Sequence, residues 1–90
     1  SNQNVQRFHQ QVIKKSLGSI KKQKFSERKL HSTIGAIDQK SYQKILQILE
    51  GAQKEVLSEM KNSEAKKVVY ACSLQFFSME NKTLTSIENN

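Results

Sequence analysis

The amino-acid sequence predicts an all-α protein, and more specifically a small antiparallel four-helix bundle. Its 90 residues contain no proline and are rich in Lys, Gln, Glu, Leu, Ile and Ala, which all favour helix over strand. Apolar residues also recur at spacings of three and four, as they do along one side of an amphipathic helix. We expect one domain over residues 3–90, because Ser1 and Asn2 resemble the remnant of a cleaved tag.

The first helix is predicted over residues 4–22. Its apolar stripe consists of Val5, Phe8, Val12, Ile13, Leu17 and Ile20. The opposite side carries the basic residues Arg7, Lys14, Lys15, Lys21 and Lys22. Gly18 lies on this polar side, where it weakens a helix by about 1 kcal/mol relative to alanine. The pattern therefore indicates a basic amphipathic helix.

A shorter pattern follows over residues 26–37. Leu30, Ile34 and Ile37 are spaced as on a helix, and Ser26 can cap it. We expect a short helix or an ordered connection here. The sequence leaves open whether it is separate from the first helix or extends it.

Three further helices complete the predicted bundle. Residues 41–61 have the clearest helical spacing, from Tyr42 to Met60. Residues 63–77 form the next predicted helix, with a buried stripe of Ala65, Val68, Val69, Cys72 and Phe76. The run from Val68 to Tyr70 has strand propensity, but the residues around it keep helical spacing. A last helix is predicted over residues 78–88, capped by Ser78 and closed against the bundle by Leu84 and Ile87.

The residues that usually carry catalysis or bind metals are sparse. Cys72 has no second cysteine to pair with and lies among apolar neighbours, so we expect it to be a buried packing residue. His9 and His31 lack a second ligand at helical spacing. Glu55 and Glu59 are a repulsive pair typical of a solvated helix face. We therefore expect no enzymatic activity, no metal site and no cofactor.

The net charge of +7 is distributed unevenly along the chain. Residues 1–40 hold nine Lys and Arg against Glu27 and Asp38, whereas residues 41–90 hold six of each sign. The basic side of the first helix has three interpretations: an ordinary solvated surface, attraction to an anionic membrane leaflet, or nucleic-acid binding. No apolar stretch approaches the ~20 residues of a membrane span, and we expect a cytoplasmic protein.

Three stretches resemble the successive helices of a known family. They are YQKILQILEGAQKEV (residues 42–56), AKKVVYACSLQFF (residues 65–77) and FSMENKTLTSIE (residues 77–88). The likeness lies in a Tyr-Gln opening before a Leu/Ile-rich helix, an Ala-x-x-Val-Val-Tyr start, and a Phe-Ser step into Glu-Asn-Lys. In these features the chain resembles the bacteriocin immunity proteins, which protect lactic-acid bacteria and streptococci from pediocin-like (class IIa) bacteriocins.

The resemblance implies a cytosolic, non-enzymatic four-helix bundle that is partly peripheral at the inner face of the membrane. Its partner would be the complex of a bacteriocin with its receptor, the membrane components of the mannose phosphotransferase permease. Specificity in the family lies largely in the C-terminal half. This implies a partner-binding set here of Phe76, Phe77, Ser78, Met79, Glu80, Asn81 and Lys82.

Two questions stay open on the sequence. Phe76 and Phe77 point about 100° apart on a helix, so either both belong to the core or one is a partly exposed contact. The function also has rivals from other classes. A small basic nucleic-acid-binding regulator would use the same lysines as the immunity protein, and a purely structural helical partner domain would need none of them.

Overall fold

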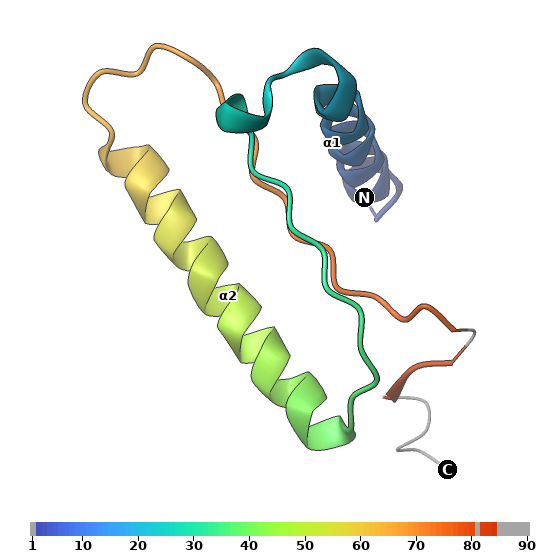
Figure 1. Ribbon diagram of the computed structural model, residues 1–90. Coiled ribbons are helices and arrows are strands. Elements are labelled where there is room, and N and C mark those ends of the chain that lie inside the picture. The colour runs from blue at the N-terminus through green and yellow to red at the C-terminus, as the bar shows by residue number, and fades with distance from the viewer. Residues whose placement is uncertain (1, 81, 85–90) are drawn as a thin grey trace. The chain divides into compact units, whose positions relative to one another are not determined.

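The structure is a computed structural model that describes residues 2–80 and 82–84. Its elements are helix α1 (Asn2–Lys22), a short 3₁₀ helix η1 (Phe25–Glu27) and helix α2 (Gln39–Asn62), as Figure 1 shows. The described residues form no β-strand. The prediction of an all-α protein is therefore confirmed at this level.

Helix α1 forms where the basic amphipathic pattern predicted a helix. The helix begins at Asn2 and continues through Gly18 to Lys22. It ends with local hydrogen bonds: the Gln23 N–H donates to the Ser19 carbonyl (3.0 Å), and the Ser19 hydroxyl donates to the Ser16 carbonyl (2.7 Å). The basic residues Lys21 and Lys22 lie in its last turn, where the helix dipole favours positive charge.

The chain folds back on α1 directly after it ends. The Lys24 N–H donates to the Glu27 carboxylate (2.9 Å), which holds the single turn of η1. The Arg28 side chain then reaches back, and its Nε donates to the Ser19 carbonyl at 3.2 Å. Its guanidinium also lies over the Phe25 ring, 6.0 Å from the ring centre. Arg28 therefore joins this turn to the C-terminal end of α1.

The prediction of a short helix over residues 26–37 is wrong for the residues that follow η1. Helical structure is limited to Phe25–Glu27, and residues 28–38 have no helical conformation. Thr33, Ile34 and Ile37 are β-branched and lose side-chain freedom in a helix, while Gly35 loses backbone entropy there. Three apolar residues at helical spacing do not offset these costs. The segment is the ordered connection that the sequence left as the alternative.

Helix α2 has a defined cap at each end. The Asp38 carboxylate accepts a hydrogen bond from the Ser41 N–H at 2.8 Å, so Asp38 is the N-cap. At the other end, the Lys66 ammonium donates to the carbonyls of Met60 (3.2 Å) and Lys61 (3.3 Å), which have no partner within the helix. The prediction of a long helix over residues 41–61 is confirmed, with two extra residues at its start and one at its end.

The prediction of a four-helix bundle is wrong for the described residues. Residues 63–77, predicted as a third helix, contain no helical residue; they bend at Glu64, Ala65 and Val68 and then follow an extended path in Figure 1. Residues 78–80, 82 and 83 are not helical either, and only Leu84 has helical conformation in the last predicted helix. The remainder of that prediction, at Asn81 and residues 85–90, lies outside the described residues. Two long helices are too few for a bundle.

The described residues also lack the core that a bundle requires. The chain divides into two units, Ser1–Ile34 and Gly35–Asn90. No described residue in either unit is buried. The half-buried apolar side chains of α2 keep helical spacing: Tyr42, Ile45, Leu46, Leu49 and Val56. Both units therefore leave large apolar side chains open to contact.

Candidate binding surfaces

The first candidate surface is the cationic side of α1, which bears the five basic residues predicted to bind an anionic surface. Arg7, Lys14, Lys15, Lys21 and Lys22 all lie on this helix, which contains no acidic residue. The unit Ser1–Ile34 holds eight Lys and Arg against Glu27 alone, whereas the unit Gly35–Asn90 holds seven of each sign. The first unit therefore carries the whole net charge of +7.

A shallow depression lies on this cationic side in the C-terminal half of α1. Its lining residues are Lys14, Lys15, Gly18, Ser19, Lys22 and Gln23. Gly18 contributes no side chain, and a Cβ built there would meet no atom within 4 Å. Within the described residues, no carboxylate forms an ion pair with these lysines. The site therefore presents three ammonium groups around an open floor, which suits a phosphate group.

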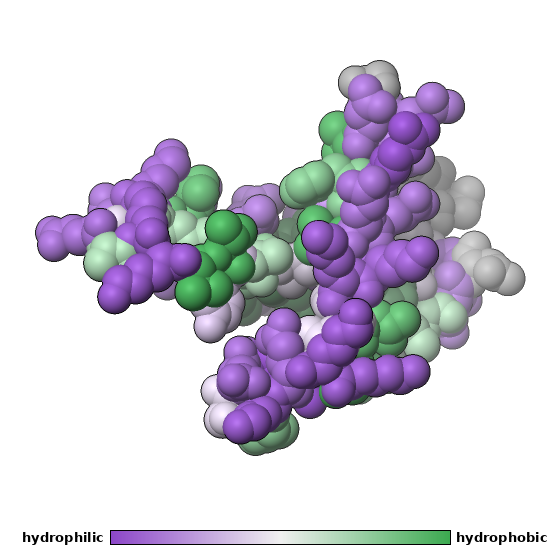
Figure 2. Space-filling view, turned by 90° about the horizontal axis from the view of Figure 1, so that it is seen from above, coloured by the Kyte–Doolittle hydropathy of each residue, from purple (hydrophilic) through white to green (hydrophobic). Residues whose placement is uncertain are grey.

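The opposite side of α1 exposes apolar residues. Phe8 is 60% exposed and Leu17 is 64% exposed, and Val5, Ile13 and Ile20 are also open to solvent. Figure 2 shows hydrophobic residues reaching the surface among the hydrophilic ones that dominate this view. Both sides of the amphipathic helix are therefore available to a ligand.

The second candidate surface is the segment predicted to bind a protein partner. The Phe76 ring stacks on the Tyr42 ring of α2, with ring centres 5.5 Å apart and planes at 29°. Phe76 is still 39% exposed and Phe77 is 71% exposed. The interpretation that both belong to a core is thus wrong, and both rings are exposed, whereas their role as a partner contact stays a prediction.

Two further residues of the predicted partner-binding set, Glu80 and Lys82, lie within hydrogen-bond distance of the Ser78 hydroxyl. That hydroxyl accepts a hydrogen bond from the Glu80 N–H at 3.0 Å and lies 2.7 Å from the Lys82 carbonyl oxygen, to which it can donate. Ser78 therefore organises a turn that leaves Met79 exposed. Asn81 lies outside the described residues.

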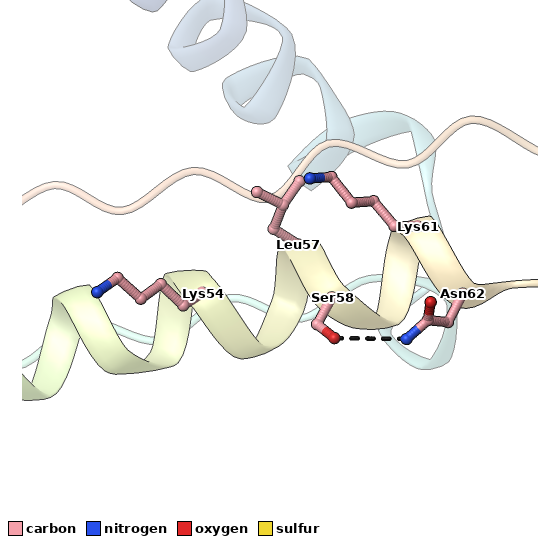
Figure 3. Close-up of a pocket in the computed structure, with 5 residues that line it drawn as sticks. All are labelled: Lys54, Leu57, Ser58, Lys61 and Asn62. Atoms are coloured by element: carbon pink, nitrogen blue, oxygen red, sulfur yellow. Dashed lines mark hydrogen bonds between the residues drawn. The ribbon is translucent and has the colours of Figure 1, made fainter.

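A second depression lies near the C-terminal end of α2 and was not predicted from the sequence. Figure 3 shows its five lining residues, Lys54, Leu57, Ser58, Lys61 and Asn62, which all come from this helix. The Asn62 amide donates to the Ser58 hydroxyl at 3.5 Å. Lys54 and Lys61 are seven residues apart, two helical turns, which is the only signal that the sequence offers. Two lysines line this depression, and none of its lining residues is acidic.

Residues capable of catalysis remain dispersed. Cys72 is exposed, so the prediction of a buried packing residue is wrong. His9 lies edge-on to the Phe8 ring, with centres 5.7 Å apart. The described part of the chain brings no three His, Cys, Asp or Glu residues together in a group that could hold a metal ion. A hydrogen bond from the Ser41 N–H, supported by the Ser41 hydroxyl, lowers the pKa of Asp38, which is explained by its capping role.

Neither helix in the described residues has the length and apolar character needed to cross a bilayer. No curated protein and no solved structure matches the chain at a significant level. A family described as a domain of unknown function, DUF4423, matches residues 1–79. Since this match covers most of the sequence, including α1, η1, α2 and the extended segment up to Met79, the chain belongs to the DUF4423 family.

Proposed function

We propose that this chain is a non-enzymatic binding protein whose helix α1 lies on an anionic membrane surface. The observation that carries the proposal is the combination of two accessible sides on one helix. One side has five cations and no acid, and the other has a stripe of exposed apolar residues.

Each side supplies a different part of the binding energy. Basic residues near an anionic leaflet contribute about 1 kcal/mol each, and the apolar side of such a helix enters the boundary between headgroups and acyl chains. Lysine stems can extend along the apolar surface while the ammonium groups stay with the phosphates. A nucleic acid would use the cations but would leave Phe8 and Leu17 exposed to water.

The experiment places a fluorescent reporter on the apolar side of α1. In the variant Phe8→Trp, the emission should shift to the blue with vesicles of phosphatidylserine and phosphatidylcholine, and should not shift with phosphatidylcholine alone. The matched control is Ile48→Trp, because the exposure of Ile48 (66%) is close to that of Phe8 (60%), but Ile48 lies on α2. Its emission should stay that of an indole in water. An unshifted Phe8→Trp spectrum on anionic vesicles would contradict the proposal.

A finer form of the proposal is an immunity protein that acts at the inner face of the membrane. It rests on the resemblance described above, of which residues 42–56 lie on α2. The partner would be the complex of a pediocin-like bacteriocin with the mannose permease, bound through Phe77, Met79 and the adjoining turn. Production of the chain in a sensitive strain should raise its tolerance to one or a few such peptides. Unchanged tolerance across a broad panel would remove this finer form.

A second candidate function, nucleic-acid binding, is favoured by one observation. The depression around Gly18 offers three lysines on an open floor, which would also fit a phosphate of a nucleic-acid backbone. Gel-shift titration against salt separates this candidate from the first, because binding through phosphates weakens steeply as salt increases. The membrane proposal requires little nucleic-acid binding at physiological salt.

A further inference from the structure

Residues 68–76 have the pattern of a β-strand with one apolar side. Every second residue of this segment is apolar: Val68, Tyr70, Cys72, Leu74 and Phe76. In extended chain, alternate side chains point to the same side. The stack of Phe76 on Tyr42 shows that this side is directed at α2 at one end of the segment.

The backbone of this segment is unpaired. Within the part of the chain that the structure describes, no backbone N–H or C=O of residues 69–77 makes a hydrogen bond. An extended run of β-branched and aromatic residues with free backbone groups is a template for another strand. Val69, at 99% exposed, shows how open the segment is.

We propose that residues 68–76 pair antiparallel with the same segment of a second copy of this chain, across a twofold axis at Cys72. In this register Val68 lies opposite Phe76 of the other copy, and Tyr70 lies opposite Leu74. Every directly opposed pair on this side is then apolar. Aromatic and β-branched residues are favourable cross-strand partners.

Charge also favours a second copy as the occupant. The unit Gly35–Asn90 has equal numbers of basic and acidic residues, so two such units do not repel each other through net charge. Segment 68–76 itself contains no charged residue. A strongly charged partner would form no ion pair with this segment, whereas an identical neutral segment places an apolar residue opposite each apolar residue along the whole length.

Cys72 reports directly on the proposed register. Directly opposed residues of an antiparallel pair have Cα atoms about 4.5 or 5.5 Å apart, within the range of disulfide bonds. Diamide would remove two electrons and two protons from the two Cys72 thiols, form the disulfide, and itself become the hydrazine. We expect a band of twice the chain mass on a non-reducing gel, which dithiothreitol reverses.

The matched control moves the thiol by one residue. In the double variant Cys72→Ser, Ser73→Cys, the two copies of residue 73 are offset along the strands, with Cα atoms ~8 Å apart, beyond disulfide reach. We expect at least tenfold slower cross-linking than for the native chain. Equal rates at the two positions would overturn the proposed pairing.

Light scattering tests the association without a covalent bond. We expect the reduced native chain to be dimeric at micromolar concentration. The double variant Ala71→Pro, Cys72→Pro removes two successive N–H groups, one of which faces the other copy whichever opposed pairs are hydrogen-bonded, and should weaken the dimer at least tenfold while the circular dichroism of α1 and α2 stays unchanged. A native chain that remains monomeric up to 100-fold higher concentration would also overturn the proposal.

Discussion

Neutralising two cations of α1 should weaken membrane binding by an amount that can be worked out in advance. Lys14 and Lys15 both line the depression around Gly18. The double variant Lys14→Gln, Lys15→Gln removes two positive charges while keeping residues of similar helix propensity. At about 1 kcal/mol for each basic residue near an anionic leaflet, the loss is about 2 kcal/mol. Since 1.4 kcal/mol corresponds to a factor of ten, vesicle affinity should fall about 30-fold.

Flotation with vesicles rich in phosphatidylserine at 0.1 M salt measures this affinity. The matched control is Lys54→Gln, Lys61→Gln, which removes the same charge from the depression on α2 and should bind like the native chain. At 1 M salt the screening length falls from about 10 Å to about 3 Å, so the native chain and the α1 variant should converge. Equal losses in the two double variants would refute the reasoning, because binding would then follow net charge rather than α1.

Four further predictions concern local structure. Gly18→Ala adds a Cβ in open space and should stabilise α1 by about 1 kcal/mol, so circular dichroism should show more helix; a decrease would contradict the geometry at this residue. Asp38→Ala should reduce the helicity of α2, because the Ser41 N–H loses its acceptor. Since the pKa of Asp38 is lowered in the folded state, the stability that its carboxylate gives to α2 is complete above the ordinary pKa of 3.8 and is lost as pH falls through the lower pKa of the folded state. Asp38→Asn should remove this part of the loss of helix stability in acid. Identical helicity at every pH in the two proteins would argue against the cap. A double-mutant cycle with Tyr42→Leu and Phe76→Leu should give a coupling energy of about 0.5–1.5 kcal/mol in urea unfolding, and a coupling of zero would rule out the stack in solution.

The two long helices could be predicted from the sequence, with their ends correct to within two residues. Their apolar residues follow helical spacing over about five turns or more, and no competing pattern fits the same residues. The start of α2 is set by a local device, the Asp38 carboxylate on the Ser41 N–H. This feature depends only on neighbouring residues, but Asp38 was not identified as the cap from the sequence, and the predicted helix began two residues late.

The error over residues 63–77 came from two periods that share the same residues. Val68, Cys72 and Phe76 are four apart, so they fit one side of a helix, but four is also twice two, so they equally fit one side of a strand. Tyr70 and Leu74 complete the strand pattern, and the helical interpretation assigned them no place in its stripe. The strand propensity of Val68 to Tyr70 was the signal in the sequence against a helix, and the structure has neither a helix nor a strand there.

The predicted core residues failed for a different reason. Cys72 was judged by its apolar character, as was the alternative that put both Phe76 and Phe77 in a core, but burial depends on a partner surface, and the bundle that would have supplied one is not formed by the described residues. An exposed apolar side chain is common in proteins, whereas a unit without a single buried residue is not. The exposed stripes on α1 and on residues 68–76 are therefore better interpreted as contact surfaces than as misplaced core.

The proposals differ in how much tertiary structure they require. Membrane binding by α1 needs only that the helix forms, since periodicity then separates its cations from its apolar residues, and net charge bears on association rather than on fold. Strand pairing at residues 68–76 likewise needs only an extended backbone. The immunity proposal requires more, because its resemblance to a helical family extends over residues 65–77, which are not helical here. A negative tolerance assay would therefore remove the immunity proposal and leave the membrane proposal intact, whereas an unshifted Phe8→Trp spectrum would count against both.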